Sequence, residues 1–137
     1  MALIARGDGE GRDPQLLRQI EEFGRQREGC QRAGNRQGEA AALLNIASTR
    51  LLLADLKDAL DAATAARELS AKAKDTESEL RELLLAGHVQ LALGQVDKAD
   101  ALVRDGLALC RRSREARFAD AAKSAVEGLA AAASAMA

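Results

Sequence analysis

The sequence has almost no aromatic residues: it contains no tryptophan, no tyrosine and only two phenylalanines among its 137 residues. Apolar residues still make up 47% of the chain, and most of them are alanine or leucine. β-Sheets favour aromatic and β-branched residues, whereas alanine and leucine suit closely packed helices. The composition therefore disfavours a β-sandwich and predicts an all-α protein.

The chain also lacks an excess of charge, a long apolar run and any catalytic motif. Its formal net charge of −1 gives no reason to expect binding to nucleic acid or to an acidic membrane surface. No stretch reaches the roughly 18 uncharged apolar residues of a membrane span. One histidine is present, and no phosphate-binding, metalloprotease, serine-hydrolase or calcium-loop pattern occurs. We expect no enzyme activity, cofactor, metal or membrane insertion.

What the chain does have is a near-repeat with a period of forty residues. The segment that begins at Leu43 matches the segment that begins at Leu83. Residues of the same kind recur at matching places, as in Leu43 and Leu83, Ala47 and Gly87, Leu51 and Leu91, Ala59 and Ala99, and Leu69 and Leu109. A period of this size is typical of stacked-repeat proteins, whose units bury their apolar faces against their neighbours. It favours a binding function over catalysis.

The two cysteines, Cys30 and Cys110, lie two repeat periods apart. Equivalent positions in units two steps apart are too distant for a disulfide, which needs Cα atoms within about 7 Å. We expect both to be small buried apolar residues with free thiols. Free thiols favour a reducing compartment, so the expected location is intracellular, with the cytoplasm favoured.

The spacing of apolar residues and the helix-start signals predict about six helices joined by short turns. Asp13 and Pro14 are a typical N-cap and first residue of a helix. Thr76 and Glu79 have the pattern of a capping box. The expected helices cover residues 14–33 and 36–54, a third from its N-cap Asp55 to about 75, a fourth over 76–94, a fifth that carries Val96 to Leu109, and a sixth from about 115 to the C-terminal alanine run.

These features resemble the tetratricopeptide repeat (TPR) family in its longer variety. The resemblance depends on an apolar residue and an apolar–small pair in one helix, and on small residues in the next. These are Leu43, Ile46, Ala47, Ala59, Ala63 and Ala66 in one unit, and Leu83, Ala86, Gly87, Ala99, Val103 and Gly106 in the other. The turns LLLADLKDA and LALGQVDKA also resemble the family's usual turn. The family's tyrosine is replaced by Arg50 and Gln90, and its inter-repeat proline is missing.

The resemblance implies antiparallel helix pairs stacked as a short right-handed solenoid. Residues 13–34 correspond to the second half of a repeat, and residues 35–74 and 75–114 to two full repeats. Residues 115–137 correspond to a capping helix, so that 13–137 form one TPR-like domain. The remaining residues, 1–12, are predicted to be a flexible N-terminal segment.

In this family the first helix of each pair lines a concave groove. The resemblance therefore implies a partner-binding surface made of Leu44, Ser48, Leu51, Leu52, Arg81, Leu84, His88 and Leu91. The expected function is a non-catalytic protein–protein interaction module, or scaffold, that holds a partner peptide or helix in an apolar groove. Burial inside the protein is the competing explanation for the leucines, because their runs cover more than one helix face.

Two full repeats are fewer than the three or so that independent stability normally needs. One alternative is therefore a structural subunit that is permanently embedded in a large multiprotein complex. Another is a piece of a longer repeat protein, because the first half of a repeat is missing before Asp13.

Overall fold

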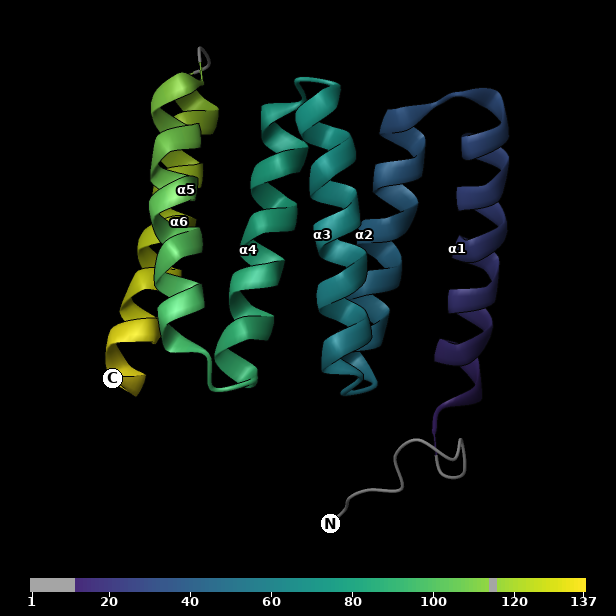
Figure 1. Cartoon of the computed structure of the whole chain (residues 1–137), viewed down its shortest axis with the longest axis horizontal. Coiled ribbons are helices and arrows are strands. Elements are labelled where there is room, and N and C mark those ends of the chain that lie inside the picture. The colour runs from purple at the N-terminus through teal and green to yellow at the C-terminus, as the bar shows by residue number, and fades with distance from the viewer. Residues whose placement is uncertain (1–11, 114–115) are drawn as a thin grey trace.

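The computed structural model describes residues 12–113 and 116–137. In this part of the chain every regular element is a helix and no strand occurs, as the composition predicts. The predicted flexible segment lies outside the described residues except for Arg12. The helices follow one another along a row (Figure 1): α1 (Pro14–Ala33), α2 (Arg36–Leu52), α3 (Leu56–Lys72), α4 (Thr76–Ala92), α5 (Val96–Arg112) and α6 (Ala116–Met136).

The same helix–turn unit recurs twice within each forty-residue repeat. Helices α2, α3, α4 and α5 are each 17 residues long. Each of the four turns from α1 to α5 contains one residue in the left-handed conformation: Gly34 (φ 71°), Ala54 (φ 63°), Lys74 (φ 57°) and Gly94 (φ 76°). These residues lie at even intervals, so the chain reverses direction in the same way at each turn. Helices α2, α3 and α4 therefore end two or three residues before the positions that the sequence predicts, whereas α1 ends at Ala33 as predicted.

Side-chain caps start three of the helices. The carboxylate of Asp13 accepts a hydrogen bond from the amide of Gln15 at 2.8 Å, as the sequence predicts. The side chain of Asn35 accepts one from the amide of Gly38 at 2.9 Å. At α4 the capping residue is Asp75, whose carboxylate accepts from the Ser78 amide at 3.2 Å. The predicted capping box is therefore wrong, because Thr76 is the first helical residue and does not cap the helix.

The turn at Ala54 offers a direct stability test. A residue with a Cβ pays about 1–2 kcal/mol in the left-handed region, whereas glycine does not. We expect Ala54→Gly to raise the free energy of unfolding by about 1 kcal/mol in urea titrations. The reverse change, Gly94→Ala, is the matched control at the equivalent turn, where nothing lies within 4 Å of the added methyl. It should lower the free energy of unfolding by a similar amount, and effects of the same sign from the two changes would contradict this explanation.

The helices form two layers. Each helix packs against its neighbours in sequence, and α4 also contacts both α2 and α6. Among the described residues, the backbone of α3 does not closely approach that of α1 or α5, although the long side chain of Arg67 on α3 reaches Asp105 on α5 at 3.2 Å. The even-numbered helices therefore share one layer and the odd-numbered helices the other. This arrangement is consistent with stacked helix pairs.

Small residues lie where the helices cross most closely. Ala47 on α2 and Ala59, Ala63 and Ala66 on α3 are fully buried. A Cβ added at Gly87 would come within 2.4 Å of the Leu129 side chain. Larger side chains at these positions would push neighbouring helices apart, which explains the alanine-rich composition and the small residues of the repeat.

The interior consists of two clusters that meet at α4. One joins α2 and α3 to α4 around Leu43, Ala63 and Ala86. The other joins α4 to α5 and α6 around Leu83, Val126 and Leu129, with half-buried Phe118 packed against it. Because α4 contributes to both clusters, it is the helix on which the two halves of the molecule depend.

An ion pair recurs with the repeat and joins successive units. The Nε atom of Arg27 lies 3.8 Å from Oε2 of Glu39, and the Nε atom of Arg67 lies 3.6 Å from Oε2 of Glu79. Each pair connects an odd-numbered helix to the first turn of the next even-numbered helix. Ion pairs of this kind contribute up to about 1 kcal/mol each, so they fix the register more than they stabilise the stack.

Both end helices expose polar residues where the inner helices bury apolar ones. On α4, Leu80, Leu83, Gly87 and Leu91 are buried. The equivalent α6 residues are Asp120, Lys123, Glu127 and Ala131, and all four are exposed. On α1, Gln19 and Gln26 are exposed at the positions of the buried Ala59 and Ala66. Polar outer faces of this kind are typical of the capping helices of repeat proteins.

Candidate interaction surface

Three of the predicted binding residues form a row along α2. Leu44, Ser48 and Leu52 are spaced four residues apart, which places them on one face of the helix. Leu44 is half-buried, Ser48 is exposed, and Leu52 is 73% exposed. Leu52 is the most exposed large apolar side chain among the described residues. An apolar side chain this accessible contributes little to the core.

A matching row lies on α4. Arg81, Leu84 and His88 share one helix face. Arg81 and His88 are exposed, and the guanidinium of Arg81 pairs with the carboxylate of Glu77 one turn earlier. Leu84 is half-buried and packs against the core cluster of α4, α5 and α6. It is therefore partly a structural residue.

The two remaining predicted residues do not belong to these rows. Leu91 is only 7% exposed and is a member of the core cluster around Leu83. Its place in this cluster of α4, α5 and α6 favours the competing explanation from the sequence, burial inside the protein. Leu51 is half-buried. For both leucines, packing is the explanation that the observed burial favours.

We call the surface made of Leu44, Ser48, Leu52, Arg81, Leu84 and His88 the α2–α4 face. Its two rows lie on helices that contact each other. The repeat places Leu84 at the position of Leu44, and His88 at the position of Ser48. On α6 the corresponding positions hold Ser124 and Gly128, which are both exposed. The face is thus apolar and uncharged over most of its length, with its one cation, Arg81, at one end.

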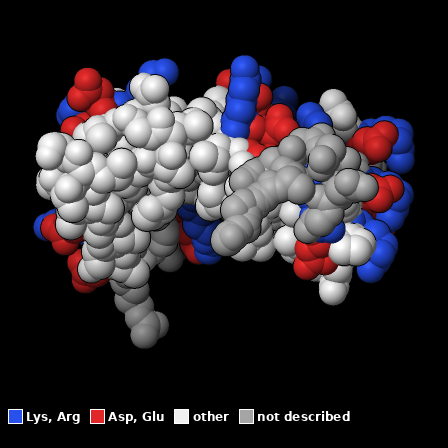
Figure 2. Space-filling view, turned by 90° about the horizontal axis from the view of Figure 1, so that it is seen from below, with Lys and Arg blue, Asp and Glu red and all other residues white. Residues whose placement is uncertain are grey.

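A second surface combines low charge with exposed apolar residues. Figure 2 shows a broad area without lysine, arginine, aspartate or glutamate at the end of the molecule formed by α4, α5 and α6. The chain has no such residue between Leu83 and Val96 or between Gly128 and Ala137. Leu93 is 40% exposed and Met136 is 49% exposed in these segments. We call this surface the uncharged end.

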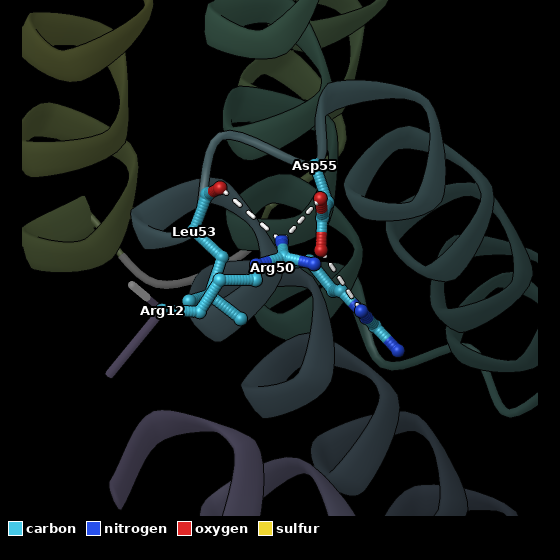
Figure 3. Close-up of polar contacts among 4 residues, drawn as sticks. All are labelled: Arg12, Arg50, Leu53 and Asp55. Carbon is cyan, nitrogen blue, oxygen red and sulfur yellow. Dashed lines mark hydrogen bonds and ion pairs between the residues drawn. The ribbon is translucent and has the colours of Figure 1, made fainter. Parts of the chain in front are cut away.

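An arginine just before α1 joins the start of that helix to the α2–α3 turn (Figure 3). The guanidinium of Arg12 lies 2.5 Å from Oδ1 of Asp55 and donates a hydrogen bond to the carbonyl oxygen of Leu53 at 3.4 Å. Arg50 donates to the other carboxylate oxygen of Asp55 at 2.9 Å. Burial raises the pKa of Asp55, but the hydrogen bonds from Arg12 and Arg50 outweigh it and lower the pKa below its ordinary value. Sequence reasoning missed this contact because it assigned Arg12 to the flexible segment.

A carboxyl group is buried between α3 and α4. Glu82 is 1% exposed, and its Oε2 accepts a hydrogen bond from the hydroxyl of Ser70 at 3.0 Å. Its other oxygen, Oε1, is buried without a hydrogen-bond partner. Burial raises the pKa of Glu82 to about 7, and the carboxylates of Asp75 and Glu79 add to this against the hydrogen bond from Ser70. The sequence does contain a sign that position 82 is buried, because the equivalent residues in the neighbouring repeats, Ala42 and Ala122, are apolar.

The remaining chemistry-bearing side chains do not form a reactive cluster. Cys30 is half-buried and Cys110 is buried, and neither forms a disulfide. Burial raises the pKa of the Cys110 thiol, which makes it less reactive. Within residues 12–113 and 116–137, no group of three or more histidine, cysteine or acidic residues is placed to hold a metal ion. No helix among the described residues is long and apolar enough to cross a membrane.

A shallow hollow lies on the other side of the molecule from the α2–α4 face, between α3 and α5. Its lining is mostly apolar and includes Leu60, Ala86, Ala101 and Leu102, with Arg67 and Lys98 at its edge. None of the predicted binding residues lines it. It carries two cations, Arg67 and Lys98, against the one of the α2–α4 face, so it is the weaker candidate for an apolar partner helix.

Comparison of the chain with protein-family models, with curated proteins and with solved structures gives no match. The resemblance to TPR proteins therefore depends on the residues and the helix arrangement of this chain alone.

Proposed function

We propose that this protein is a non-catalytic interaction module of TPR type that binds a helix or peptide of a partner protein on the α2–α4 face. The observation that carries the proposal is the exposure of Leu52, 73% of whose surface is open to solvent next to Ser48 and half-buried Leu44. Exposed apolar side chains in a row are how helical proteins seat the apolar face of a partner helix.

The composition of the face indicates what the partner offers. Leu44, Leu52 and Leu84 supply apolar contact, while Ser48 and His88 supply hydrogen-bonding groups between them. The single cation at Arg81 already pairs with Glu77. An amphipathic helix with aliphatic residues at helical spacing fits these side chains better than an acidic peptide does.

The proposal predicts that two charged substitutions on this face abolish binding. Leu52→Glu and His88→Glu are both at exposed positions, so the protein should stay folded, with an unchanged circular dichroism spectrum and melting curve. Because each carboxylate would be desolvated beneath a partner, we expect the double variant to retain less than a tenth of the wild-type protein's specific partners in affinity purification. Unchanged capture by a folded double variant would overturn the proposal.

A second candidate is a structural subunit of a larger assembly, and the uncharged end supports it. Obligate interfaces are more apolar than transient ones, and this surface combines missing charge with exposed Leu93 and Met136. Leu93→Glu is therefore the matched control in the purification. Loss of partners with Leu93→Glu but not with the double variant would favour the structural subunit.

A further inference from the structure

The buried pair of Ser70 and Glu82 replaces an apolar contact that the chain makes elsewhere. The repeat places Cys30 and Cys110 at the position of Ser70, and Ala42 and Ala122 at the position of Glu82. The fold therefore closes this junction with a cysteine and an alanine at the two neighbouring places. A buried carboxyl group at the middle junction is not a requirement of the fold.

The buried carboxyl group of Glu82 lowers the stability of the folded protein. A carboxylate taken out of water needs hydrogen bonds to both oxygens or a paired cation. Glu82 has one hydrogen bond, from Ser70. Among the described residues, the one cation that acts on it is Arg81, an exposed neighbour on the same helix. Residues that break a local rule without a structural gain often have a functional role.

We propose that the α3–α4 interface is a proton-controlled joint, packed tightly while Glu82 carries a proton and weakened when Glu82 ionises. The joint lies between the two interior clusters, one of which contains Ala63 and Ala86 and the other Leu83 and Val126. The two rows of the α2–α4 face lie on either side of it. A change at the joint therefore alters the spacing between those rows.

Burial is the largest influence on the ionisation of Glu82, and the groups around it act in both directions. Asp75 in the α3–α4 turn and Glu79 on α4 are carboxylates, which oppose its ionisation, whereas Arg81 on α4 favours it. From α3 it meets the neutral hydroxyl of Ser70. The other buried polar residue among those described is Thr49, so α2, α5 and α6 contribute no buried ionisable group except the thiol of Cys110.

The size of the effect follows from the two protonation equilibria. The pKa of Glu82 is about 7 in the closed joint and returns to its ordinary value of 4.5 when the joint opens. As pH rises, the open form ionises first and is favoured. The ratio of open to closed joint then increases about 70-fold between pH 5 and pH 8.

Native-state hydrogen exchange on the full chain tests this inference. Backbone amides of α3 and α4 near Ser70 and Glu82, corrected for intrinsic exchange rates, should lose protection about 70-fold between pH 5 and pH 8. Glu82→Gln should abolish this dependence. The matched control is Glu68→Gln, an exposed carboxyl on α3, which should leave it unchanged.

Three outcomes would overturn the joint. They are protection that is independent of pH in the wild-type protein, a dependence that persists in Glu82→Gln, and amides near Ser70 and Glu82 that exchange only through global unfolding, with the same opening free energy as the rest of the core. If Glu82→Gln does not fold, the double variant Ser70→Cys, Glu82→Ala is used in its place. It copies the residues that close the equivalent junction, where Cys30 packs against α2. A carbon-13 NMR titration of the Glu82 carboxyl with a midpoint near 4.5 would also contradict the proposal.

Discussion

Replacing Leu83 with alanine is expected to lower the free energy of unfolding by about 3 kcal/mol. Leu83 is fully buried on α4, and its side chain lies against Gly106 on α5, where an added Cβ would be 3.3 Å from it. Truncation removes this contact and leaves a cavity where α4, α5 and α6 meet. Urea denaturation followed by circular dichroism measures the loss.

The matched control is Leu52→Ala, the same substitution at a leucine that is 73% exposed. Its effect on the free energy of unfolding should be within about 0.5 kcal/mol of zero. The two leucines therefore separate a core role from a surface role within one type of residue. Equal destabilisation by the two changes would mean that Leu52 is covered in solution, and the α2–α4 face would no longer be a free surface.

The second large effect is a fall in stability as pH rises, and Glu82 causes it. Its pKa is raised to about 7 in the folded protein from 4.5 when exposed, so the folded state holds its proton over a range where the unfolded state has released it. The contribution of Glu82 to stability is therefore complete below pH 4.5, falls as pH rises to 7, and is constant above that. Between pH 5 and pH 8 we expect a loss of about 2–3 kcal/mol in the free energy of unfolding.

Glu82→Gln should make this profile flat, because the amide does not ionise. Denaturation at pH 5, 6, 7 and 8 compares the variant with the wild-type protein, and Glu127→Gln, an exposed carboxyl on α6, is the control. Asp55 has the opposite sign, since its lowered pKa adds stability that is lost only in more acidic solutions. A wild-type profile that rises or stays level from pH 5 to pH 8 would show that Glu82 is not buried as described.

The positions of the helices could be predicted from the sequence because the signals that start, continue and end a helix are local. Alanine and leucine at helical spacing, the Asp13–Pro14 start and the glycines at 34 and 94 all act within a turn or two. The left-handed turns at Ala54 and Lys74 carry no glycine, so only the even spacing of the turns indicates them. The burial of Leu91 depends on its packing with other helices, which no local sequence pattern indicates.

Long-range polar contacts could not be predicted in the same way. Arg12 meets Asp55 across the α1–α2 pair, and neither residue has a neighbour in sequence that indicates the other. Glu82 stands among charged residues and resembles a surface position. Only its alignment with Ala42 and Ala122 indicates a buried site, and the partner on α3, Ser70, is known from the packing alone.

The central claim, that partners bind on the α2–α4 face, is tested most directly by site-specific photo-crosslinking in cells. A photoreactive residue in place of Ser48 probes the face, and one in place of Glu68, which is exposed on α3, probes the opposite layer. We predict that the probe at position 48 captures the same protein in repeated experiments, that the probe at position 68 does not, and that Leu52→Glu removes the crosslink. Capture that is equal at both positions, or confined to position 68, would contradict the claim.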